Sequence, residues 1–175
     1  MNATPDGCHL RPATAADLPA IVRLMRELVP LMRAAGNLQW SADYPDEAVF
    51  RQDIARRHLW VALLDDTLAG VAALTNNDQD PEYAGADWDA TEAALVTHRL
   101  AVAPAAQGRG VAQALLAQAE TEARRQGLRV LRVDTNSENV VTQRLFPKLG
   151  YRFAGEIGLV FRPGLRFFCY EKRLA

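Results

Sequence analysis

Four segments of the chain are predicted to form helices from the spacing of their apolar residues or from their end residues. Between the capping pair Thr14 and Asp17 and the end at Gly36, apolar residues recur at spacings of three and four. Pro30 removes a hydrogen bond within this segment, so one bent helix or two short helices are expected. The other predicted helices are residues 45–57, with acids in the first turn and arginines in the last, residues 108–126, with an apolar stripe, and residues 139–149.

Short apolar or alternating segments predict strands between these helices. Residues 58–64 and 68–75 flank Asp65-Asp66-Thr67, which fits two antiparallel strands joined by a tight turn. The polar and acidic residues 76–90 are predicted to be a loop. Further strands are expected at residues 9–13, 93–102, 129–135, 151–156 and 167–174. Because strands and helices alternate along the chain, we expect them to be arranged around one mixed sheet.

The composition is that of a folded domain. The 175 residues contain no internal repeat and no linker-like stretch, so we expect a single domain over residues 1–175. Apolar residues make up 49% of the chain and charged residues 23%, which excludes a disordered protein. A net charge of -1 gives no uniform basic field, so we expect neither nucleic acid nor a membrane as a partner, although a local basic patch stays open.

Cysteine content and the absence of targeting segments favour a cytoplasmic protein. Cys8 and Cys169 are too few for a disulfide scaffold or a four-cysteine zinc site, and they suit a reducing compartment. The first twenty residues lack the basic start and apolar stretch of a secretory signal. No apolar run reaches the roughly 18 residues that a membrane span requires. No His, Cys, Asp or Glu cluster has metal-ligand spacing, so no metal site is expected.

Residues 100–116 run from a predicted strand through a glycine-containing turn into the strongest predicted helix. Backbone N–H groups at a helix start lack internal partners and carry the positive end of the helix dipole, so this turn suits a phosphate or pyrophosphate. Gly108 and Gly110 allow close approach of the backbone, and Ala112 keeps the next turn small. Neither G-x-x-x-x-G-K-[ST] nor G-x-G-x-x-G occurs here. Taken alone, the segment is equally compatible with an ordinary strand-to-helix turn.

Two motifs resemble those of a known family. Gln107-x-x-Gly110-x-Ala112, preceded by Val102-x-Pro104 and followed by Leu115-Leu116, resembles the coenzyme A pyrophosphate loop of the GCN5-related N-acetyltransferase (GNAT) superfamily. Downstream, Asn139, Leu145-Phe146 and Leu149-Gly150-Tyr151 are similar to the second acetyl-CoA segment of that superfamily. The resemblance covers residues 92–156 closely, and the preceding helix-helix-strand-strand order is similar to the amino-terminal half of the family.

The resemblance implies a binding mode for acetyl-CoA, with the thioester in a gap where neighbouring strands splay apart. The backbone of Leu100, Ala101 and Val102 would pair with the pantetheine amides, and Asn139 would bind the pantetheine arm. The pyrophosphate would be held by the loop residues Gln107, Gly108, Arg109, Gly110, Val111 and Ala112.

One residue departs from the family pattern. Phe146 stands where family members often have a tyrosine that protonates the departing thiolate, and phenylalanine cannot donate this proton. Either Tyr151 or Tyr170 substitutes for it, or solvent protonates the thiolate, or the protein binds acetyl-CoA without fast turnover.

His98 is the candidate base. Strand alternation places Val96, His98 and Leu100 on one face, and if that face borders the cleft, His98 is poised to accept a proton. An alkylammonium acceptor with a pKa near 10.4 must lose a proton before it can attack, and histidine titrates in a suitable range. In some aralkylamine acetyltransferases of the superfamily a histidine is placed similarly. The alternative is a structural histidine bonded within the sheet, and His9 and His58 are interpreted as structural.

Aromatic residues in the connecting segments are the candidates for lining the acceptor site. Trp40 and Tyr44 join the two amino-terminal helices, which in this superfamily form much of the acceptor wall, and Trp40 either lines a pocket or caps the core. Trp88 is a third candidate. The acids Asp78, Asp80, Glu82, Asp87 and Asp89 would attract a cationic amine or merely solvate a loop. The arginines Arg124, Arg125, Arg129 and Arg132 would contact the 3′-phosphate of the nucleotide or lie in solvent, and Cys169 is interpreted as a packed strand residue.

We therefore expect a single-domain α/β protein of the GNAT type, with a central mixed, mostly antiparallel sheet and helices on both faces. The expected activity is acyl transfer from acetyl-CoA to a primary amine of a small molecule or peptide by direct attack. A backbone N–H near Val102 would stabilise the developing oxyanion. The alternatives are a non-catalytic acetyl-CoA binding or sensing module and a phosphate-binding interaction domain. The sequence does not select an acceptor, and a homodimer stays open.

Overall fold

The computed structural model describes residues 5–76 and 81–175, without the side chains of Pro81 and Glu82. Over this part of the chain, seven strands form one sheet in the order β1-β2-β3-β4-β5-β7-β6, and β4–β5 is its only parallel pair. The strands are β1 (Cys8–Pro12), β2 (Leu59–Leu64), β3 (Thr67–Asn76), β4 (Ala94–Val102), β5 (Val130–Asn136), β6 (Arg152–Leu159) and β7 (Arg162–Arg173). The expected mixed, mostly antiparallel sheet is thus confirmed.

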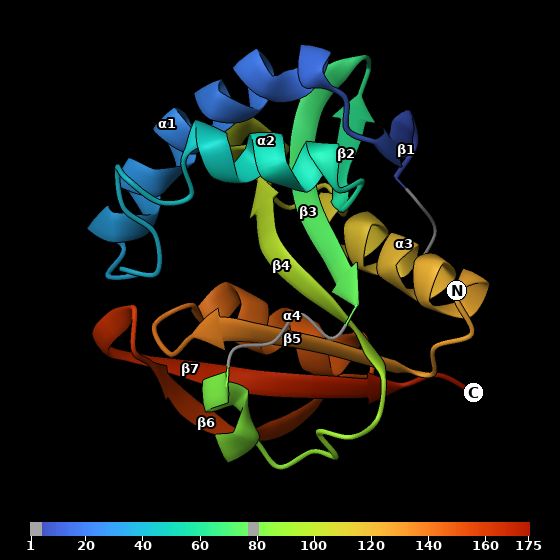
Figure 1. Cartoon of the computed structure of the whole chain (residues 1–175). Helices are drawn as coiled ribbons and strands as arrows, with labels where there is room; N and C mark the ends of the chain where they lie inside the picture. Colours follow the sequence, from blue (N-terminus) through green and yellow to red (C-terminus); the bar gives the residue numbers. More distant parts are fainter. Residues whose placement is uncertain (1–4, 77–80) are drawn as a thin grey trace.

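Helices cover both faces of the sheet. The described helices are α1 (Leu18–Ala34), α2 (Glu47–Ala55), α3 (Val111–Arg125) and α4 (Val140–Lys148), with short 3-10 helices η1 (Ala15–Asp17), η2 (Pro81–Gly85) and η3 (Pro104–Ala106). Figure 1 shows α1 and α2 together over β2 to β4, with α3 against the other side of these strands. The buried side chains Ile21 and Phe50 fill the core below α1 and α2, whereas Leu115 and Phe146 belong to the core below α3 and α4.

Local chemistry explains where the helices begin. The carboxylate of Asp17 accepts a hydrogen bond from the backbone N–H of Thr14 (2.7 Å), so the predicted capping pair is confirmed. The Asp46 side chain caps α2 by accepting from the N–H of Val49 (2.9 Å). Pro30 lies inside α1, which is one helix rather than two.

A close approach between α3 and the sheet depends on Gly70 in β3. A Cβ atom there would lie 2.8 Å from the carbonyl oxygen of Ala101 and 2.8 Å from Cγ1 of Val111. No side chain fits at these distances without displacing the strand or the helix. Gly70 therefore lets the first turn of α3 pack directly on β3.

A bulge in β4 changes the side-chain pattern expected from strict alternation. Val71 pairs with Ala101 but Ala73 pairs with His98, so β4 has one extra residue here, and Arg99 adopts a left-handed φ of 51°. Leu95 and Leu100 consequently contact the same core, although alternation would place them on opposite faces. The prediction that His98 and Leu100 share one face is therefore wrong, because the bulge lies between them.

The strands β4 and β5 separate beyond the bulge. Their parallel pairing runs from Ala94–Val130 to Thr97–Val133 and stops there, although both strands continue. The bulge and the end of this pairing coincide, so the sheet opens next to His98. This is the splayed gap that the family resemblance implies.

The carboxyl-terminal strands are longer than predicted. Residues 157–166 complete a hairpin of β6 and β7 around the two-residue turn Val160-Phe161, and Gly158 and Gly164 interrupt the apolar pattern that would have predicted it. Side chains of this hairpin and of η2 form a third small core.

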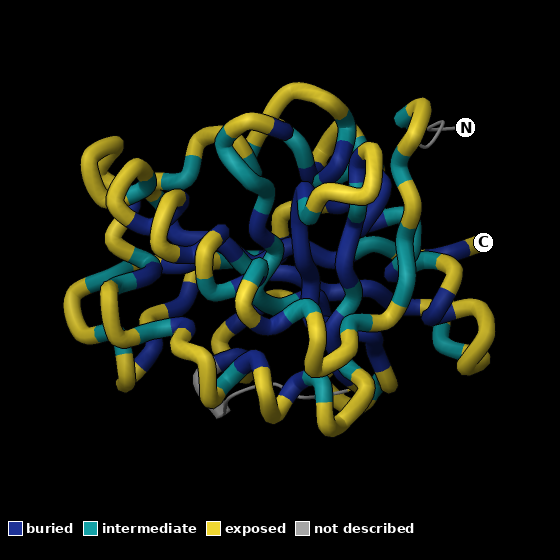
Figure 2. The backbone as a smooth tube through the Cα atoms, turned by 90° about the horizontal axis from the view of Figure 1, so that it is seen from above, coloured by how far each residue is buried: buried dark blue, intermediate teal, exposed yellow. Residues whose placement is uncertain are grey.

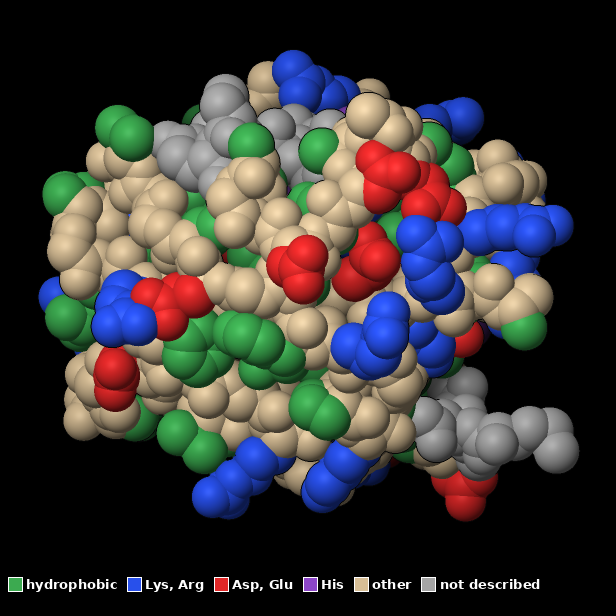
Figure 3. Space-filling model, turned by 90° about the horizontal axis from the view of Figure 1, so that it is seen from below, with side chains coloured by type: hydrophobic (Ala, Val, Ile, Leu, Met, Phe, Trp, Pro, Cys, Tyr) green, Lys and Arg blue, Asp and Glu red, His purple; other side chains and the backbone are tan. Residues whose placement is uncertain are grey.

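Buried residues gather in the central strands of the sheet. Figure 2 shows the central strands as the buried part and the connecting loops as the exposed part. Acidic and basic side chains are interspersed with apolar ones on the face seen in Figure 3. Within residues 5–76 and 81–175, no helix has the length and apolar character that crossing a bilayer requires.

Candidate active site

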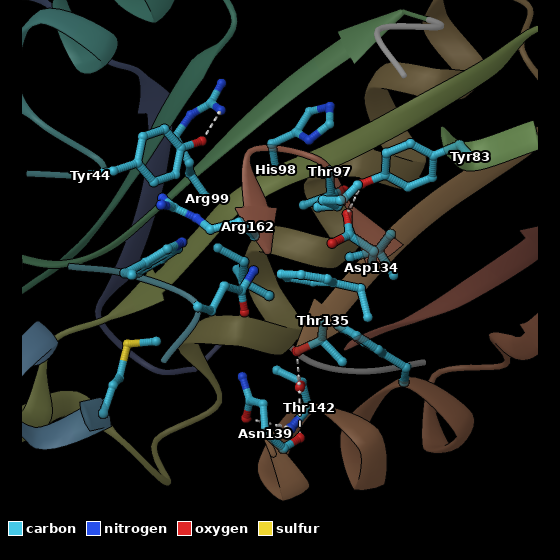
Figure 4. Close-up of a pocket in the computed structure, with 18 of the residues that line it drawn as sticks. Tyr44, Tyr83, Thr97, His98, Arg99, Asp134, Thr135, Asn139, Thr142 and Arg162 are labelled. Atoms are coloured by element: carbon cyan, nitrogen blue, oxygen red, sulfur yellow. Dashed lines mark hydrogen bonds between the residues drawn. The ribbon is translucent and has the colours of Figure 1, made fainter. Parts of the chain in front are cut away.

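The gap between β4 and β5 opens into a cavity of about 100 Å³. Its walls come from both faces of the sheet. The two splayed strands contribute Thr97–Leu100 of β4 and Val133–Thr135 of β5. The remaining lining residues are Met32 of α1, Gln39, Trp40 and Tyr44 of the α1–α2 connector, Tyr83 of η2, Asn139, Thr142 and Phe146 at α4, and Leu159, Phe161, Arg162 and Phe167 of the β6–β7 hairpin. Five of the residues predicted from sequence line this cavity, namely Trp40, Tyr44, His98, Leu100 and Asn139. Figure 4 labels Tyr44, His98 and Asn139 among them.

The loop before α3 has the geometry of an anion site. Gly108 and Gly110 have φ values of 76° and 82°, and Gly110 is the N-cap of α3 without a capping side chain. Among the described residues, no acceptor takes a hydrogen bond from the backbone N–H of Gly108, Gly110, Val111, Ala112 or Gln113. The loop is exposed at residues 107–109, and a Cβ on Gly108 would meet no atom within 4 Å. The N–H groups at the positive end of the helix therefore have no described acceptor, which is the arrangement that an anion site requires.

The backbone of Val102 also faces the gap. The N–H of Ala103 donates to the carbonyl of Ala69 (2.8 Å), and Gly70 pairs with Val102 in the register. Hydrogen-bonded and non-hydrogen-bonded pairs alternate along an antiparallel ladder, so the N–H and C=O of Val102 point away from β3. Since β5 does not pair here, these groups are oriented as an added strand would require.

Asn139 connects the cavity to α4. Its Oδ1 accepts from the N–H of Thr142 (3.4 Å), which makes Asn139 the N-cap of the helix. The hydroxyl of Thr142 is in turn hydrogen-bonded to that of Thr135 (2.7 Å) on β5. The Nδ2 group of Asn139 donates to no described acceptor, and Asn139 is the residue that the resemblance assigns to the pantetheine arm.

His98 lies beside a carboxylate that sequence reasoning missed. Asp134 of β5 accepts a hydrogen bond from the Tyr83 hydroxyl, and all three side chains line the cavity (Figure 4). Burial raises the pKa of Asp134, whereas the Tyr83 hydrogen bond and the charge of nearby His98 oppose this rise. The sequence does contain a signal for Asp134, because an acid is unusual within the apolar strand Val130–Asn136. Only the parallel pairing of β4 and β5 shows that this acid lies near His98.

The expected acceptor aromatics divide into two groups. Trp40 is 5% exposed, so it both packs in the α1–α2 core and forms part of the cavity wall. Tyr44 lines the cavity, and its hydroxyl accepts a long hydrogen bond from Arg99 (3.5 Å). Trp88 does not line the cavity. It stacks on Tyr83 with 5.9 Å between ring centroids and lies below the guanidinium of Arg132.

The acidic loop gives little support for a cation site. Asp78 and Asp80 lie outside the described residues, as does the side chain of Glu82. Asp89 bonds Thr91 through both the backbone N–H (2.9 Å) and the hydroxyl (2.6 Å), and these bonds lower its pKa. Its carboxylate is thus engaged within its own turn.

The predicted basic cluster is also divided by the fold. Arg124 and Arg125 lie in the last turn of α3, roughly 20 Å along the helix from the loop at 1.5 Å per residue. Arg132 is 1% exposed and forms a buried ion pair with Glu171 (3.0 Å). The structure therefore does not bring Arg124, Arg125 and Arg132 to the anion site as one group.

The two tyrosines predicted as substitutes for the missing acid lie behind Phe146. Phe146 is 1% exposed and lines the cavity, with Tyr151 and Tyr170 packed against its ring at centroid distances of 5.7 and 5.2 Å. Neither tyrosine lines the cavity. Burial raises the pKa of both, and the Tyr151 hydroxyl has no described partner. Thr97 does line the cavity, and its buried Oγ1 also has no described partner.

Comparisons with known proteins find the same fold in solved acetyltransferase structures. An acetyltransferase of the GNAT family from Streptococcus agalactiae 2603 is 28% identical, with a TM-score of 0.83 over 99% of each chain. The fold is shared by yncA from Salmonella typhimurium, solved with its cofactor acetyl-CoA (22% identity, TM-score 0.70, 97% of this chain and 95% of that one). It is also shared by the paiA N-acetyltransferase from Thermoplasma acidophilum in complex with coenzyme A (20% identity, TM-score 0.69, 95% and 98%).

A search of the curated proteins found no match. The profile of the acetyltransferase (GNAT) family matches residues 23–151, which include most of α1, all of α2, the splayed strands, the loop before α3 and the cavity-lining part of α4. On this match, the chain belongs to the acetyltransferase (GNAT) family.

Proposed function

We propose that this protein is an N-acetyltransferase that transfers the acetyl group of acetyl-CoA to a primary amine by direct attack. One observation carries this proposal: the loop before α3 and the cavity both belong to the part of the sheet where β4 and β5 separate. Backbone N–H groups without a described acceptor precede α3, and a cavity lined by His98 and Asp134 lies where β4 and β5 separate.

The loop and the splayed strand fit acetyl-CoA. The N–H groups of Gly108, Gly110 and Val111 would bind the pyrophosphate, and the backbone of Val102 would pair with the pantetheine amides. Asn139, on the opposite wall of the gap, would donate through Nδ2 to the same arm. The solved relatives from Salmonella typhimurium and Thermoplasma acidophilum contain acetyl-CoA and coenzyme A. When bound, acetyl-CoA supplies an activated acyl carbon, and the new C–N bond forms as the C–S bond breaks.

His98 is placed to remove the proton of the acceptor. A primary amine reaches the cavity as an ammonium ion, and the imidazole takes its proton directly or through one water molecule. The neighbouring Asp134 carboxylate, when ionised, stabilises the resulting imidazolium. A backbone N–H near Val102 would stabilise negative charge on the acyl oxygen.

The proton for the departing sulfur comes from solvent or from a group other than residue 146. Phe146 has no proton to give, and Tyr151 and Tyr170 lie outside the cavity lining. The Thr97 hydroxyl is positioned to order a water molecule in the gap. The same observation favours the second candidate function, a module that binds acetyl-CoA without turnover.

Turnover separates the two functions. Purified protein is incubated with acetyl-CoA and a panel of primary amines, and free thiol and acetylated amine are both quantified. The proposal predicts equal amounts of thiol and acetylated amine with at least one amine. Tight acetyl-CoA binding with hydrolysis-level thiol release across the panel would support the binding module instead.

A further inference from the structure

Two arginines line the cavity, and one of them has its charge balanced. Arg99 donates from Nε and Nη2 to the two carboxylate oxygens of Asp53 at 2.7 and 2.8 Å. Both side chains are mostly buried. This bidentate ion pair ties the bulge of β4 to α2, so Arg99 has little capacity left for a further anion.

Arg162 differs from Arg99 in its partners. It is the first residue of β7, directly after the turn Val160-Phe161, and its guanidinium lies 4.5 Å from the ring centroid of Tyr44. The Phe161 ring is 5.7 Å away. Within the described part of the chain, Arg162 forms no ion pair and no side-chain hydrogen bond. The cation–π contact with Tyr44 thus holds the guanidinium at the cavity, and no described acceptor takes a hydrogen bond from its N–H donors.

The charges of the cavity are separated in space. Figure 4 shows Arg162 next to Tyr44 on one side, and His98, Thr97 and Asp134 on the other. The His98 side is where the acceptor amine loses its proton under the proposed function. An acceptor that extends from His98 toward Tyr44 would therefore bring its far end to Arg162.

We propose that the acceptor is an amine that also carries a carboxylate, as a free amino acid does, and that Arg162 binds this carboxylate. A planar guanidinium with unused donors matches a carboxylate in a two-point hydrogen-bonded pair. Tyr44 serves as the platform that orients it. The inference rests on the proposed function for the position of the amine, and it makes Arg162 a specificity-determining residue.

The test uses matched pairs of amines that differ only in the carboxylate. L-Alanine, L-leucine, L-phenylalanine and L-methionine are paired with ethylamine, isoamylamine, phenethylamine and 3-(methylthio)propylamine. For at least one pair, the wild-type protein should favour the amino acid by tenfold or more in kcat/KM. Arg162→Gln should lower kcat/KM for that amino acid roughly 10- to 150-fold, the worth of hydrogen bonds to a charged group. The kcat/KM for the paired amine without the carboxylate should not change in Arg162→Gln. Arg162→Lys should recover part of the loss in kcat/KM for the amino acid.

Arg166→Gln is the matched control. Arg166 lies on the same strand, carries the same charge and pairs with Glu156 outside the cavity. Its replacement should therefore leave kcat/KM unchanged for both members of the pair. Thermal unfolding of each variant checks that the fold is intact. A raised KM for acetyl-CoA in Arg162→Gln would assign the arginine to the co-substrate and overturn the inference. Equal use of both members of every pair would also overturn it.

Binding measurements keep this inference distinct from the proposed function. Calorimetric titration of the same amine pairs into the protein saturated with coenzyme A requires no turnover. If no amine is acetylated, the proposed function fails, but preferential binding of an amino acid that Arg162→Gln abolishes would still support the carboxylate site. Absence of that preference in every pair would refute it.

Discussion

Replacing Gly110 by aspartate tests the anion site before α3, and replacing it by alanine provides the control. Gly110 has a φ of 82°, so either side chain imposes a similar backbone penalty of roughly 1–2 kcal/mol. Either Cβ would also lie 3.0 Å from Cγ of Pro5, which must shift slightly. The two variants therefore share the backbone penalty and the contact of Cβ with Pro5, and they differ in the carboxylate, which adds one negative charge.

The magnitude of the charge effect follows from Coulomb's law. A carboxylate about 5 Å from one phosphate charge contributes about 1–3 kcal/mol of repulsion for an effective dielectric constant between 80 and 20. This corresponds to a roughly 5- to 150-fold increase in the Kd for acetyl-CoA relative to Gly110→Ala. Because the loop is exposed, the difference should shrink as salt is raised.

Isothermal titration of acetyl-CoA into the two variants, at low and high salt, measures this difference. Thermal unfolding should show similar midpoints for both variants. If Gly110→Asp binds acetyl-CoA as tightly as Gly110→Ala at low salt, the pyrophosphate does not lie at this helix start and the binding mode is wrong.

Three further substitutions probe the acceptor wall and the fold. Trp40→Ala should raise the KM of the acceptor with little change for acetyl-CoA, and because the ring is buried it should also destabilise by about 3–5 kcal/mol; lost stability with normal kinetics would limit Trp40 to the core. Asp53→Asn should lower stability in urea titrations by about 3–5 kcal/mol, because it leaves Arg99 buried without its partner; a change below about 1 kcal/mol would contradict this. The Arg11 hydrogen bonds lower the pKa of Asp17 to about 2, so Asp17→Asn should destabilise by about 1–2 kcal/mol above pH 4, less than the full shift because Arg11 is partly exposed. This difference should vanish as the pH falls through about 2, and a difference independent of pH would count against the ion pair.

Much of the fold could be predicted from local patterns. The capping pair at Thr14, the hairpin around Asp65-Asp66 and the strand-loop-helix at Gly110 each have a short-range signal that the structure confirms. The β6–β7 hairpin was partly missed because Gly158 and Gly164 break the apolar alternation. A segment was therefore predicted correctly where its own neighbouring residues determine its conformation, and incompletely where they do not.

The candidate site was predictable only in part, because it depends on contacts between distant segments. The bulge at Arg99 is held in place by Asp53, 46 positions earlier, and no local pattern predicts a left-handed arginine within a strand. Asp134 reaches His98 only because β4 and β5 run parallel. Trp88 is an aromatic in a connector like Trp40, yet it packs over Tyr83 instead of lining the cavity.

The pH dependence of kcat/KM for the best acceptor, in wild type and His98→Ala, tests the central claim most directly. If His98 removes the proton of the amine, the wild-type value should rise across the range in which histidines ordinarily titrate, roughly pH 6 to 7.5. His98→Ala should lose this limb and about 10²- to 10⁴-fold in rate, while binding acetyl-CoA normally. A His98→Ala protein with wild-type turnover at every pH would contradict the account and leave ordered water as the base.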